Sequence, residues 1–546
     1  MQEQLKSHLE ESQFIIPSFD LYNGATGFQD YGLLGNVVKQ KLLKLWRDHF
    51  LFEDDFYEIE APTLLLPEIL KASGHIDRFF DYVIYDKDNK CHRADHLIKN
   101  NLKLLGQNSD VVDTWNHEQM EDYIKNNLSS TLRLDKDTIK LETKNLMYKT
   151  DEMYMRPELA QNIFVNFEQY LRFHKNKLPF GVATTGKSYR KEISPQQFIR
   201  MREFTQFELE YFFDPNCNNH SKFNTIQNIQ IPLLTSKNQL EQLGVEYINI
   251  ASAVNNNIIK SEIMGYFLAR IYLFAQLVGL KNDKIRFRQH LPNEMAHYAS
   301  ECWDLECFVD GNWLECVGCA NRQNYDLKAH SSRKCLAMKR NKIIPIMKEF
   351  GWQEKIKSST IINHLNTLTQ NDISLIQNEL LKNKSILLNV NGEEFTLNKN
   401  MVEFEQVCEE FYPHVIEPSF GIDRLMYAIF NQNFWAREND EKRIVLSLPI
   451  ILSPYDVAIL QLCNKEDLLN IVNNIKNLLK KNKILCYVDP SGVAIGKRYA
   501  RTDKLGIKYA VTVDFDSLND NCITIRERDS MKQNRISIDE LVNIFL

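Results

Sequence analysis

The order of the strand-like segments is the feature that most limits the folds open to this chain. Segments of this kind follow one another, with no regular alternation of helices, at 79–86, 180–192, 203–214, 303–318 and 385–398. Such an order favours an antiparallel sheet. From Ile444 onward, strand-like runs alternate with helical segments near 466–482 and 496–505, which is typical of a compact α/β domain. The sequence therefore predicts an α+β core on an antiparallel β-sheet with flanking helices, followed by a C-terminal α/β domain.

One amphipathic helix and three polar stretches organise the predicted core. Residues 33–52 carry apolar side chains at helical spacing, and the strand expected at 56–60 should end before Pro62, because proline cannot continue a central ladder. The polar stretches lack a sustained period and are interpreted as surface insertions. The predicted layout is core at 1–105, insertion at 106–150, core at 151–214, insertion at 215–260, core at 261–330, insertion at 331–400, core at 401–440 and the α/β domain at 441–546.

Composition excludes several classes of protein. The 546 residues are 44% hydrophobic and 25% charged, as in ordinary globular proteins and unlike disordered chains. The formal charge of −6 excludes a histone-like protein but permits a nucleic-acid partner at a local basic patch. The 11 scattered cysteines predict reduced thiols and a cytoplasmic location. We expect no secretory leader, because acidic residues stand at the start, and no membrane span.

A charged hairpin between residues 189 and 208 is the strongest candidate for chemistry. Arginine forks match phosphate oxygens, and an aromatic face can stack a purine base. This hairpin therefore resembles a nucleotide site without a P-loop. The alternative is a salt-bridged surface hairpin, since charged runs are usually solvated. The side chains concerned are Arg190, Arg200, Arg202, Glu192, Glu203, Glu208, Phe204 and Phe207.

Two helix starts carry further charges. In the segment 413–424, a strand bearing Glu417 runs through Gly421 into a helix with Arg424 in its first turn, where arginine and backbone N–H groups together attract phosphate. The alternative there is a capped helix with Asp423 in its first turn. Glu158 stands at the start of a second helix. A purely structural explanation for its position there is the preference of carboxylates for the N-terminal end of the helix dipole.

The segment 313–322 contains a Cys316-x-x-Cys319 pair that could suggest a metal site. Structural zinc usually needs two close-spaced pairs of ligands separated by a loop. In a strand, residues three apart point to opposite faces. We therefore interpret both cysteines as packed thiols, and Glu315 and Arg322 as the more informative charges.

Together these segments resemble the class II aminoacyl-tRNA synthetases. Arg190-x-Glu192 with its following strand is similar to the second signature motif, Gly421-x-x-Arg424 to the third, and the helix with the strand ending at Pro62 to the first. The finer resemblance, over nearly the whole chain, is to the dimeric, eukaryote/archaeon-like glycyl-tRNA synthetases. It rests on ASGHIDRFFD (72–81), CHRADHL (91–97), RPELAQNIFVNF (156–167), FIRMREFTQFELEYF (198–212), NEMAHYASECWDLE (293–306), ECVGCANRQNYDL (315–327), PHVIEPSFGIDR (413–424) and AIGKRYARTDKLGI (494–507).

The resemblance implies roles for individual residues. Arg190 and Arg424 would be the catalytic arginines, on the α- and γ-phosphates of ATP. Glu315 would also serve Mg²⁺. The implied ATP-binding residues are Arg190, Lys191, Glu192, Arg200, Met201, Phe204, Glu315, Cys316 and Arg424; the implied glycine-binding residues are Arg93, Glu158, Glu208, Arg322, Glu417, Pro418 and Ser419; and the implied tRNA-binding residues of the C-terminal anticodon-binding domain are Lys497, Arg498, Arg501, Arg526 and Arg528.

The activity implied is that of a cytoplasmic, homodimeric glycine–tRNA ligase that uses ATP and Mg²⁺ and acts on tRNA-Gly, with no membrane partner. One alternative is a class II enzyme that charges another amino acid. The other is a catalytically altered paralogue acting as an RNA-binding regulator. The sequence departs from the family pattern at Leu159, where a threonine is usual, and in the loop 194–199, which is about one residue shorter.

Overall fold

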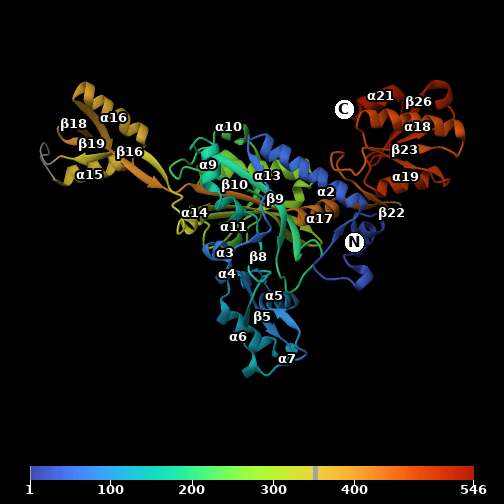
Figure 1. The fold of residues 1–546 in the computed structure, drawn as a ribbon, viewed down its shortest axis with the longest axis horizontal. Helices are drawn as coiled ribbons and strands as arrows, with labels where there is room; N and C mark the ends of the chain where they lie inside the picture. Colours follow the sequence, from blue (N-terminus) through green and yellow to red (C-terminus); the bar gives the residue numbers. More distant parts are fainter. Residues whose placement is uncertain (1, 108, 349–354, 439, 546) are drawn as a thin grey trace. The chain divides into compact units, whose positions relative to one another are not determined.

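The computed structural model describes residues 2–107, 109–348, 355–438 and 440–545. The chain divides into two compact units, one running to Ala329 and resuming at His414, the other spanning His330–Pro413. A nine-stranded sheet forms the centre of the first unit (Figure 1). Its strand order is β12 (Glu246–Asn249), β11 (Gln230–Leu234), β13 (Ile285–Gln289), β14 (Glu301–Val309), β15 (Asn312–Gln323), β20 (His414–Gly421), β10 (Glu203–Phe213), β9 (Phe180–Tyr189) and β3 (Tyr57–Ile59).

This sheet is antiparallel except at β11–β13 and β3–β9. The predicted antiparallel core is therefore confirmed. Its central hairpin pairs β9 with β10 over ten positions, from Tyr189 opposite Glu203 to Phe180 opposite Phe212. Because side chains alternate between the two faces of a strand, Phe207 and Leu209 enter the hydrophobic core while Gln206 and Glu208 face the other way.

Three helices cover the apolar face of the sheet: α2 (Leu33–Trp46), α13 (Glu262–Leu277) and α17 (Ile422–Gln432). Trp46 stacks on Phe207 with ring centroids 4.5 Å apart and meets the edge of Phe420 at 5.8 Å. The helix expected over 33–52 is an α-helix only as far as Trp46 and continues as a π-helical segment, Arg47–Phe52. This continuation buries Phe50 against the same core.

The stretch 106–150 is less of a surface insertion than its composition suggests. Strand β7 (Glu142–Asn145) pairs with β5 (Phe80–Tyr85), which also pairs with β6 (Cys91–Arg93). Helices α5 (Ala94–Leu104) and α6 (His117–Asn127) pack there around a separate core that includes Ile84, Ile98 and Ile124. The strand expected at 79–86 thus belongs to this small three-stranded sheet, and the module begins well before residue 106.

The stretch 215–260 likewise contributes to the core. Strands β11 and β12 extend the main sheet at one edge. Helix α12 (Ile250–Asn255) packs on α13, with Ile250 and Ala253 buried. These strands and this helix are only four to six residues long, which explains why the sequence shows no sustained period here.

The second unit has a core of its own. Strands β16 (Met338–Met347) and β19 (Val402–Phe411) pair along ten positions, and β17 (Ser385–Val390) pairs with β18 (Glu393–Asn398). Helices α15 (Lys355–Thr367) and α16 (Gln370–Asn383) bury Leu365 and Leu380 against Leu397. The expected strand at 385–398 is therefore a hairpin in this unit, and residues 401–411 belong here rather than to the core of the first unit.

The C-terminal α/β domain is confirmed. Its five-stranded sheet has the order β24 (Cys486–Asp489), β23 (Val457–Gln461), β25 (Tyr509–Val513), β26 (Cys522–Glu527) and β27 (Gln533–Ser537). The first three strands are parallel and the last two antiparallel. Helices α18 (Glu466–Lys481) and α19 (Ile495–Lys504) pack on it. Where the chain passes from the core to this domain, strands β21 (Phe434–Arg437) and β22 (Asp440–Leu446) pair antiparallel.

The remaining elements of the first unit are short. No helix among the described residues has the length and apolar character needed to cross a membrane. The remaining short helices and strands of the first unit are α1 (Gln2–Glu11), β1 (Ile15–Ile16), β2 (Asp30–Tyr31), β4 (Leu64–Leu65), α3 (Pro67–Ala72), α4 (His75–Arg78), α7 (Ser129–Leu132), β8 (Tyr154–Met155), α8 (Ala160–Phe164), α9 (Phe167–Phe173), α10 (Phe223–Ile226), α11 (Ser236–Leu240), α14 (Tyr325–His330), α20 (Ser517–Asp520) and α21 (Ile538–Asn543).

The start of α2 allows a test of this packing. A Cβ at Gly35 would collide with the backbone carbonyl oxygen of Phe14, whereas a Cβ at Gly244 would meet open space. We expect Gly35→Ala to lower the free energy of unfolding by about 1–3 kcal/mol through overpacking. Gly244→Ala should change it by less than about 0.5 kcal/mol. Thermal unfolding of both variants measures this, and equal unfolding temperatures would contradict the close approach.

Candidate active site

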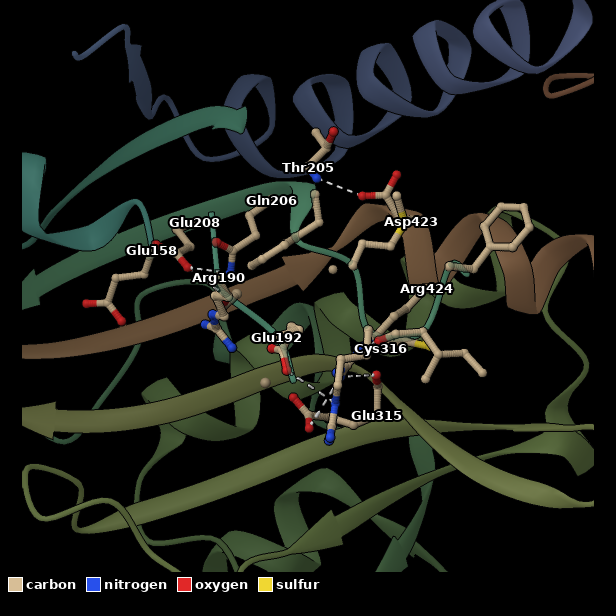
Figure 2. Close-up of a pocket in the computed structure, with 18 of the residues that line it drawn as sticks. Glu158, Arg190, Glu192, Thr205, Gln206, Glu208, Glu315, Cys316, Asp423 and Arg424 are labelled. Atoms are coloured by element: carbon tan, nitrogen blue, oxygen red, sulfur yellow. Dashed lines mark hydrogen bonds and ion pairs between the residues drawn. The ribbon is translucent and has the colours of Figure 1, made fainter. Parts of the chain in front are cut away.

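A cavity of about 250 Å³ lies on the polar face of the sheet, where β10, β15 and β20 run side by side (Figure 2). In this view Glu158 and Glu208 lie at one end, Arg424 and Glu315 at the other, and Arg190 between them. The cavity therefore has an acidic end and a basic end. The lining residues are Glu158, Arg190, Glu192, Phe198, Ile199, Arg200, Met201, Phe204, Thr205, Gln206, Glu208, Tyr298, Glu315, Cys316, Gly318, Glu417, Ser419, Gly421, Asp423 and Arg424.

Arg190 follows β9 and is held by its surroundings. Its Nε donates to the carbonyl oxygen of Pro157 at 3.2 Å. Its guanidinium carbon lies 5.2 Å from the ring centroids of both Phe79 and Phe204, a distance at which cation–π attraction operates. The remaining guanidinium donors are thus directed along a defined plane, where they can meet an anion in the cavity.

Arg424 is fixed by the backbone of two neighbouring segments. Its Nε donates to the carbonyl oxygen of Ile199 at 2.8 Å and its Nη1 to that of Glu315 at 2.9 Å. The Glu315 carboxylate stands 3.5 Å from Nη1 and its side chain is 55% exposed. A half-exposed carboxylate beside an arginine keeps an oxygen free for a hard cation such as Mg²⁺, so the donor chemistry at Glu315 fits the metal predicted there.

Asp423 anchors the helix that carries Arg424. One oxygen accepts from the backbone N of Thr205 at 2.7 Å and the other from the hydroxyl of Tyr31 at 2.5 Å. The ammonium of Lys39 lies 3.7 Å away. Burial lowers the pKa of Lys39, although Asp423 opposes this. The capped-helix alternative is thus half right: Asp423 is structural, but Arg424 faces the cavity and not solvent.

The loop between β9 and β10 is pinned at Phe198. This residue has φ 63°, a left-handed value that bulky residues rarely adopt. Its ring stacks on Tyr427 with centroids 5.1 Å apart, and Gln196 and Arg200 exchange backbone hydrogen bonds of 2.9 Å around it. The loop therefore holds one conformation against the cavity. No pattern in the sequence predicts this conformation.

The acidic end is built from three glutamates that come from different segments: Glu158, Glu208 and Glu417. Glu208 accepts from the hydroxyl of Ser419 and from Nε2 of Gln206, both at 3.0 Å, and from the backbone N of Leu159 at 2.7 Å. Glu158 accepts from Nε2 of Gln161 at 3.0 Å. These bonds orient acceptor oxygens toward the cavity.

Arg322 is the buried cation behind these acids. Its Nη1 donates to Glu417 at 2.5 Å, and its Nε and Nη2 donate to Asp326 at 2.8 and 3.0 Å. The ring of Tyr298 covers it, with the guanidinium carbon 4.0 Å from the centroid. Because the guanidinium is only 2% exposed and lies bound between these two carboxylates, Arg322 positions carboxylates and does not line the cavity.

The environments of the three glutamates separate their pKa values. Burial raises the pKa of Glu208 to about 7, with Glu158 adding to the effect. Burial also raises that of Glu417 to about 8, against Arg322. Burial would raise the pKa of Glu158 too, but His75 at 3.2 Å and Arg322 hold it well below its usual range. Glu158 is therefore the permanent anion of the cavity, and a cation entering it would favour ionisation of Glu208.

Comparison with known proteins supplies the family. Residues 142–433 match the class II tRNA synthetase core domain (G, H, P, S and T), and residues 456–546 match the anticodon binding domain. The chain is 36% identical to glycine–tRNA ligase 2 of Saccharomyces cerevisiae, covering 99% of this chain and 94% of the relative. It is also 36% identical to the glycine–tRNA ligase of Methanocaldococcus jannaschii, covering 97% and 96%.

The chain belongs to the glycine–tRNA ligases, a class II aminoacyl-tRNA synthetase family. Among solved structures, the prolyl-tRNA synthetase of Giardia lamblia in complex with prolyl-adenylate aligns with a TM-score of 0.54 at 13% identity, covering 99% of this chain and 74% of that one. At this identity the likeness concerns the fold alone.

Against this family background, the cavity gathers many of the residues predicted to bind ATP and glycine. Their individual roles stay predictions. Four predicted residues do not line it. Lys191 is exposed, Pro418 points to the opposite face of β20 from Glu417 and Ser419, and Arg322 is the buried cation described above. Arg93 also lies off the cavity.

Arg93 instead belongs to a buried charge network beside the loop. Its guanidinium pairs with Asp95 at 2.7 Å and Asp81 at 3.0 Å, and Glu192 lies 4.0 Å away. Because two carboxylates already neutralise it, the predicted contact with a substrate carboxylate is not supported. Burial raises the pKa of Asp81 to about 6, against the attraction of Arg93.

Three of the five predicted tRNA-binding residues are buried. Arg498, Arg526 and Arg528 are 1–2% exposed. Arg526 binds both oxygens of Asp503, at 2.8 and 3.1 Å, and Arg528 donates to the carbonyl oxygens of Leu448 and Gly506. These arginines stabilise the domain and cannot meet phosphates. Lys497 and Arg501 on α19 remain exposed.

The interpretation of the Cys316-x-x-Cys319 pair as packed thiols agrees with the structure. Both cysteines are buried in the hydrophobic core, and Cys319 Sγ lies 3.6 Å from the sulfur of Met264. Within the described residues, neither belongs to a group of side chains spaced to hold a metal. Sequence reasoning assigned no role to His75, Tyr298 and Asp326 at the acidic end, although each lies in a segment that carries the family resemblance.

Arg322 offers a test of the acidic end. We expect Arg322→Met to lower the free energy of unfolding by about 3–5 kcal/mol, because it leaves Asp326 and Glu417 buried without their cation. Arg172→Met removes a pair with Glu168 whose arginine is 56% exposed, and should cost less than about 1 kcal/mol. Thermal unfolding compares the two, and similar losses would contradict the role of Arg322.

Proposed function

We propose that this protein activates glycine with ATP to glycyl-adenylate and pyrophosphate, and then transfers glycine to the 3′ end of tRNA-Gly. The observation that carries the proposal is one cavity that has Arg190 and Arg424 toward one end and carboxylates at the other. Family membership supports the same reaction. No geometry favours the alternative of a regulator without catalysis, since a binding protein has no need of both Arg190 and Arg424 in one cavity.

The basic end would take ATP. Arg190 would contact the α-phosphate and the glycine carboxylate, Arg424 the γ-phosphate, and Phe204 the adenine. Glu192, Arg200, Met201 and the Cys316 backbone would complete this site. Glu315 would hold Mg²⁺ bound with ATP, which neutralises phosphate charge. Charge neutralisation and positioning are the main requirements of attack on the α-phosphorus, so no side chain is assigned as a base or nucleophile.

The acidic end would take the ammonium group of glycine. Glu158 and Glu208 would accept its N–H donors, with Ser419 and Glu417 behind them. Charge-assisted hydrogen bonds of this kind are strong. Since glycine has no side chain, selection against larger amino acids must be steric, and the side chains packed round this end of the cavity would leave no room for a methyl group.

The partners follow from the family. The C-terminal domain would bind the anticodon of tRNA-Gly, where Lys497 and Arg501 are the exposed cations of α19. Phosphate contacts of this kind weaken as salt rises. The protein would act as a homodimer in the cytoplasm.

An amino-acid panel tests the proposal. We expect ATP–pyrophosphate exchange with glycine but at least about tenfold lower kcat/KM with alanine or serine, because one added methylene is worth about 1–3 kcal/mol. Adding tRNA-Gly should yield glycyl-tRNA. Exchange with another amino acid would favour the first alternative, and tRNA binding without exchange would favour a regulator.

Arg424 tests the basic end. We expect Arg424→Ala to reduce exchange by at least about 100-fold, because a preorganised donor to the transition state is lost, while tRNA binding stays unchanged. Arg172→Ala, far from the cavity lining, is the matched control and should exchange normally. Exchange by Arg424→Ala at the wild-type rate would refute the role.

A further inference from the structure

Glu210 is a carboxyl beside the acidic end of the cavity that the proposed reaction does not use. It lies two residues after Glu208 on β10, so both side chains point to the same face. Its side chain is fully buried at 0% exposure. Among the described residues, neither of its oxygens has a hydrogen-bond partner.

Its neighbour across the sheet is another buried acid. Glu208 pairs with Ser419 and Tyr211 with Ile416, so Glu210 stands opposite Glu417. One carboxyl oxygen each from Glu208, Glu210 and Glu417 lies within 4.8 Å of the others. Like charges directly opposite one another destabilise a sheet, and the penalty is larger where water is excluded.

The available positive charge cannot balance all of these acids. Arg322 donates to Glu417 and Asp326, and among the described residues no hydrogen bond from it reaches Glu210. An anionic Glu210 would therefore face Glu417 with no donor of its own. A protonated Glu210 removes this conflict. When a bound ammonium group, together with Arg322, favours ionisation of Glu417, the Glu210 hydroxyl can donate to one Glu417 oxygen while Arg322 binds the other side of the same carboxylate.

We propose that Glu210 is a positioning residue for glycine, which in its protonated form donates a hydrogen bond to Glu417 and fixes that carboxylate behind the ammonium site. The proposal rests on the proposed role of the acidic end. It assigns Glu210 no contact with substrate. It explains why a third glutamate persists where a charge would be costly.

The electrostatic surroundings agree with this arrangement. Burial raises the pKa of Glu210 well above its usual range, and Glu417 adds to the rise. The charged groups that act on it are Glu208 on β10, Glu417 on β20, Arg322 on β15 and Asp326 on α14. Loss of the proton would place two anions opposite one another and loosen the glycine site.

Three variants of the full-length protein test the proposal by steady-state pyrophosphate exchange at pH 7. Glu210→Gln keeps a donor of the same size and should leave the KM for glycine within about twofold of wild type. Glu208→Gln, the same exchange two residues away, should raise it at least about tenfold. Glu210→Met removes the donor and should raise the KM for glycine about tenfold while the KM for ATP stays unchanged.

The results of these variants distinguish a protonated, positioning Glu210 from an anionic Glu210 and from one with no positioning role. A Glu210→Gln variant as impaired as Glu208→Gln would show that Glu210 acts as an anion and would overturn the proposal. An unchanged KM for glycine in Glu210→Met would overturn the positioning role. If Glu210→Met fails to fold, Glu210→Asp replaces it, since a shortened carboxyl cannot reach Glu417 and should raise the KM for glycine selectively.

Failure of the proposed function can be distinguished from failure of the role proposed for Glu210. If the wild-type protein shows no ATP–pyrophosphate exchange with glycine as substrate, both proposals are overturned at once. Wild-type protein that exchanges with glycine, combined with a raised KM for both glycine and ATP in the Glu210 variants, would overturn only the role of Glu210, because general damage and not glycine positioning would then explain the loss.

Discussion

The pairing of β10 with β20 is the contact on which the functional site depends. It joins Gln206 to Gly421 and Glu208 to Ser419, two segments more than 200 residues apart in the chain. Because strand side chains alternate, Phe207 and Phe420 enter the core under α2 and α17 while Glu208 and Ser419 face the cavity. A slip of one residue would exchange these faces. The core and the site are therefore specified by the same register.

Charge balance is the second constraint. The site concentrates acids where water is excluded, and one buried arginine, Arg322, holds two of them. The rest of the balance comes from protons and from the substrate's own positive charge. Such an arrangement is unfavourable without a cation bound, which suits a site meant to take an ammonium group. At the other end, Arg190 and Arg424 are held by backbone carbonyls, so their positions do not depend on the bound anion.

Much of the core could be predicted from local patterns. The β9–β10 hairpin, the Gly421 turn into α17 and the α/β order after Ile444 each follow from periodicity and turn chemistry within a short window. The polar stretches could not be predicted in this way. The module with β5, β6 and β7 and the edge strands β11 and β12 are built from short elements, so the hydrophobic pattern of each is too brief to show a sustained period. Three of the five predicted tRNA-binding residues are buried for a related reason: a basic run in a sequence does not reveal whether Arg526 faces solvent or Asp503.

The sequence by itself determined the family, the two fold classes and the residue types that meet in the cavity, because motifs and periodicity are local. Only the tertiary structure decided which charges reach that cavity. Arg322, Arg93, Arg498, Arg526 and Arg528 resemble ligand-binding arginines in the sequence, yet all are paired or buried. Whether an ionisable group binds a substrate or another residue depends on what packs against it from distant parts of the chain, and burial and pairing exist only in the folded protein.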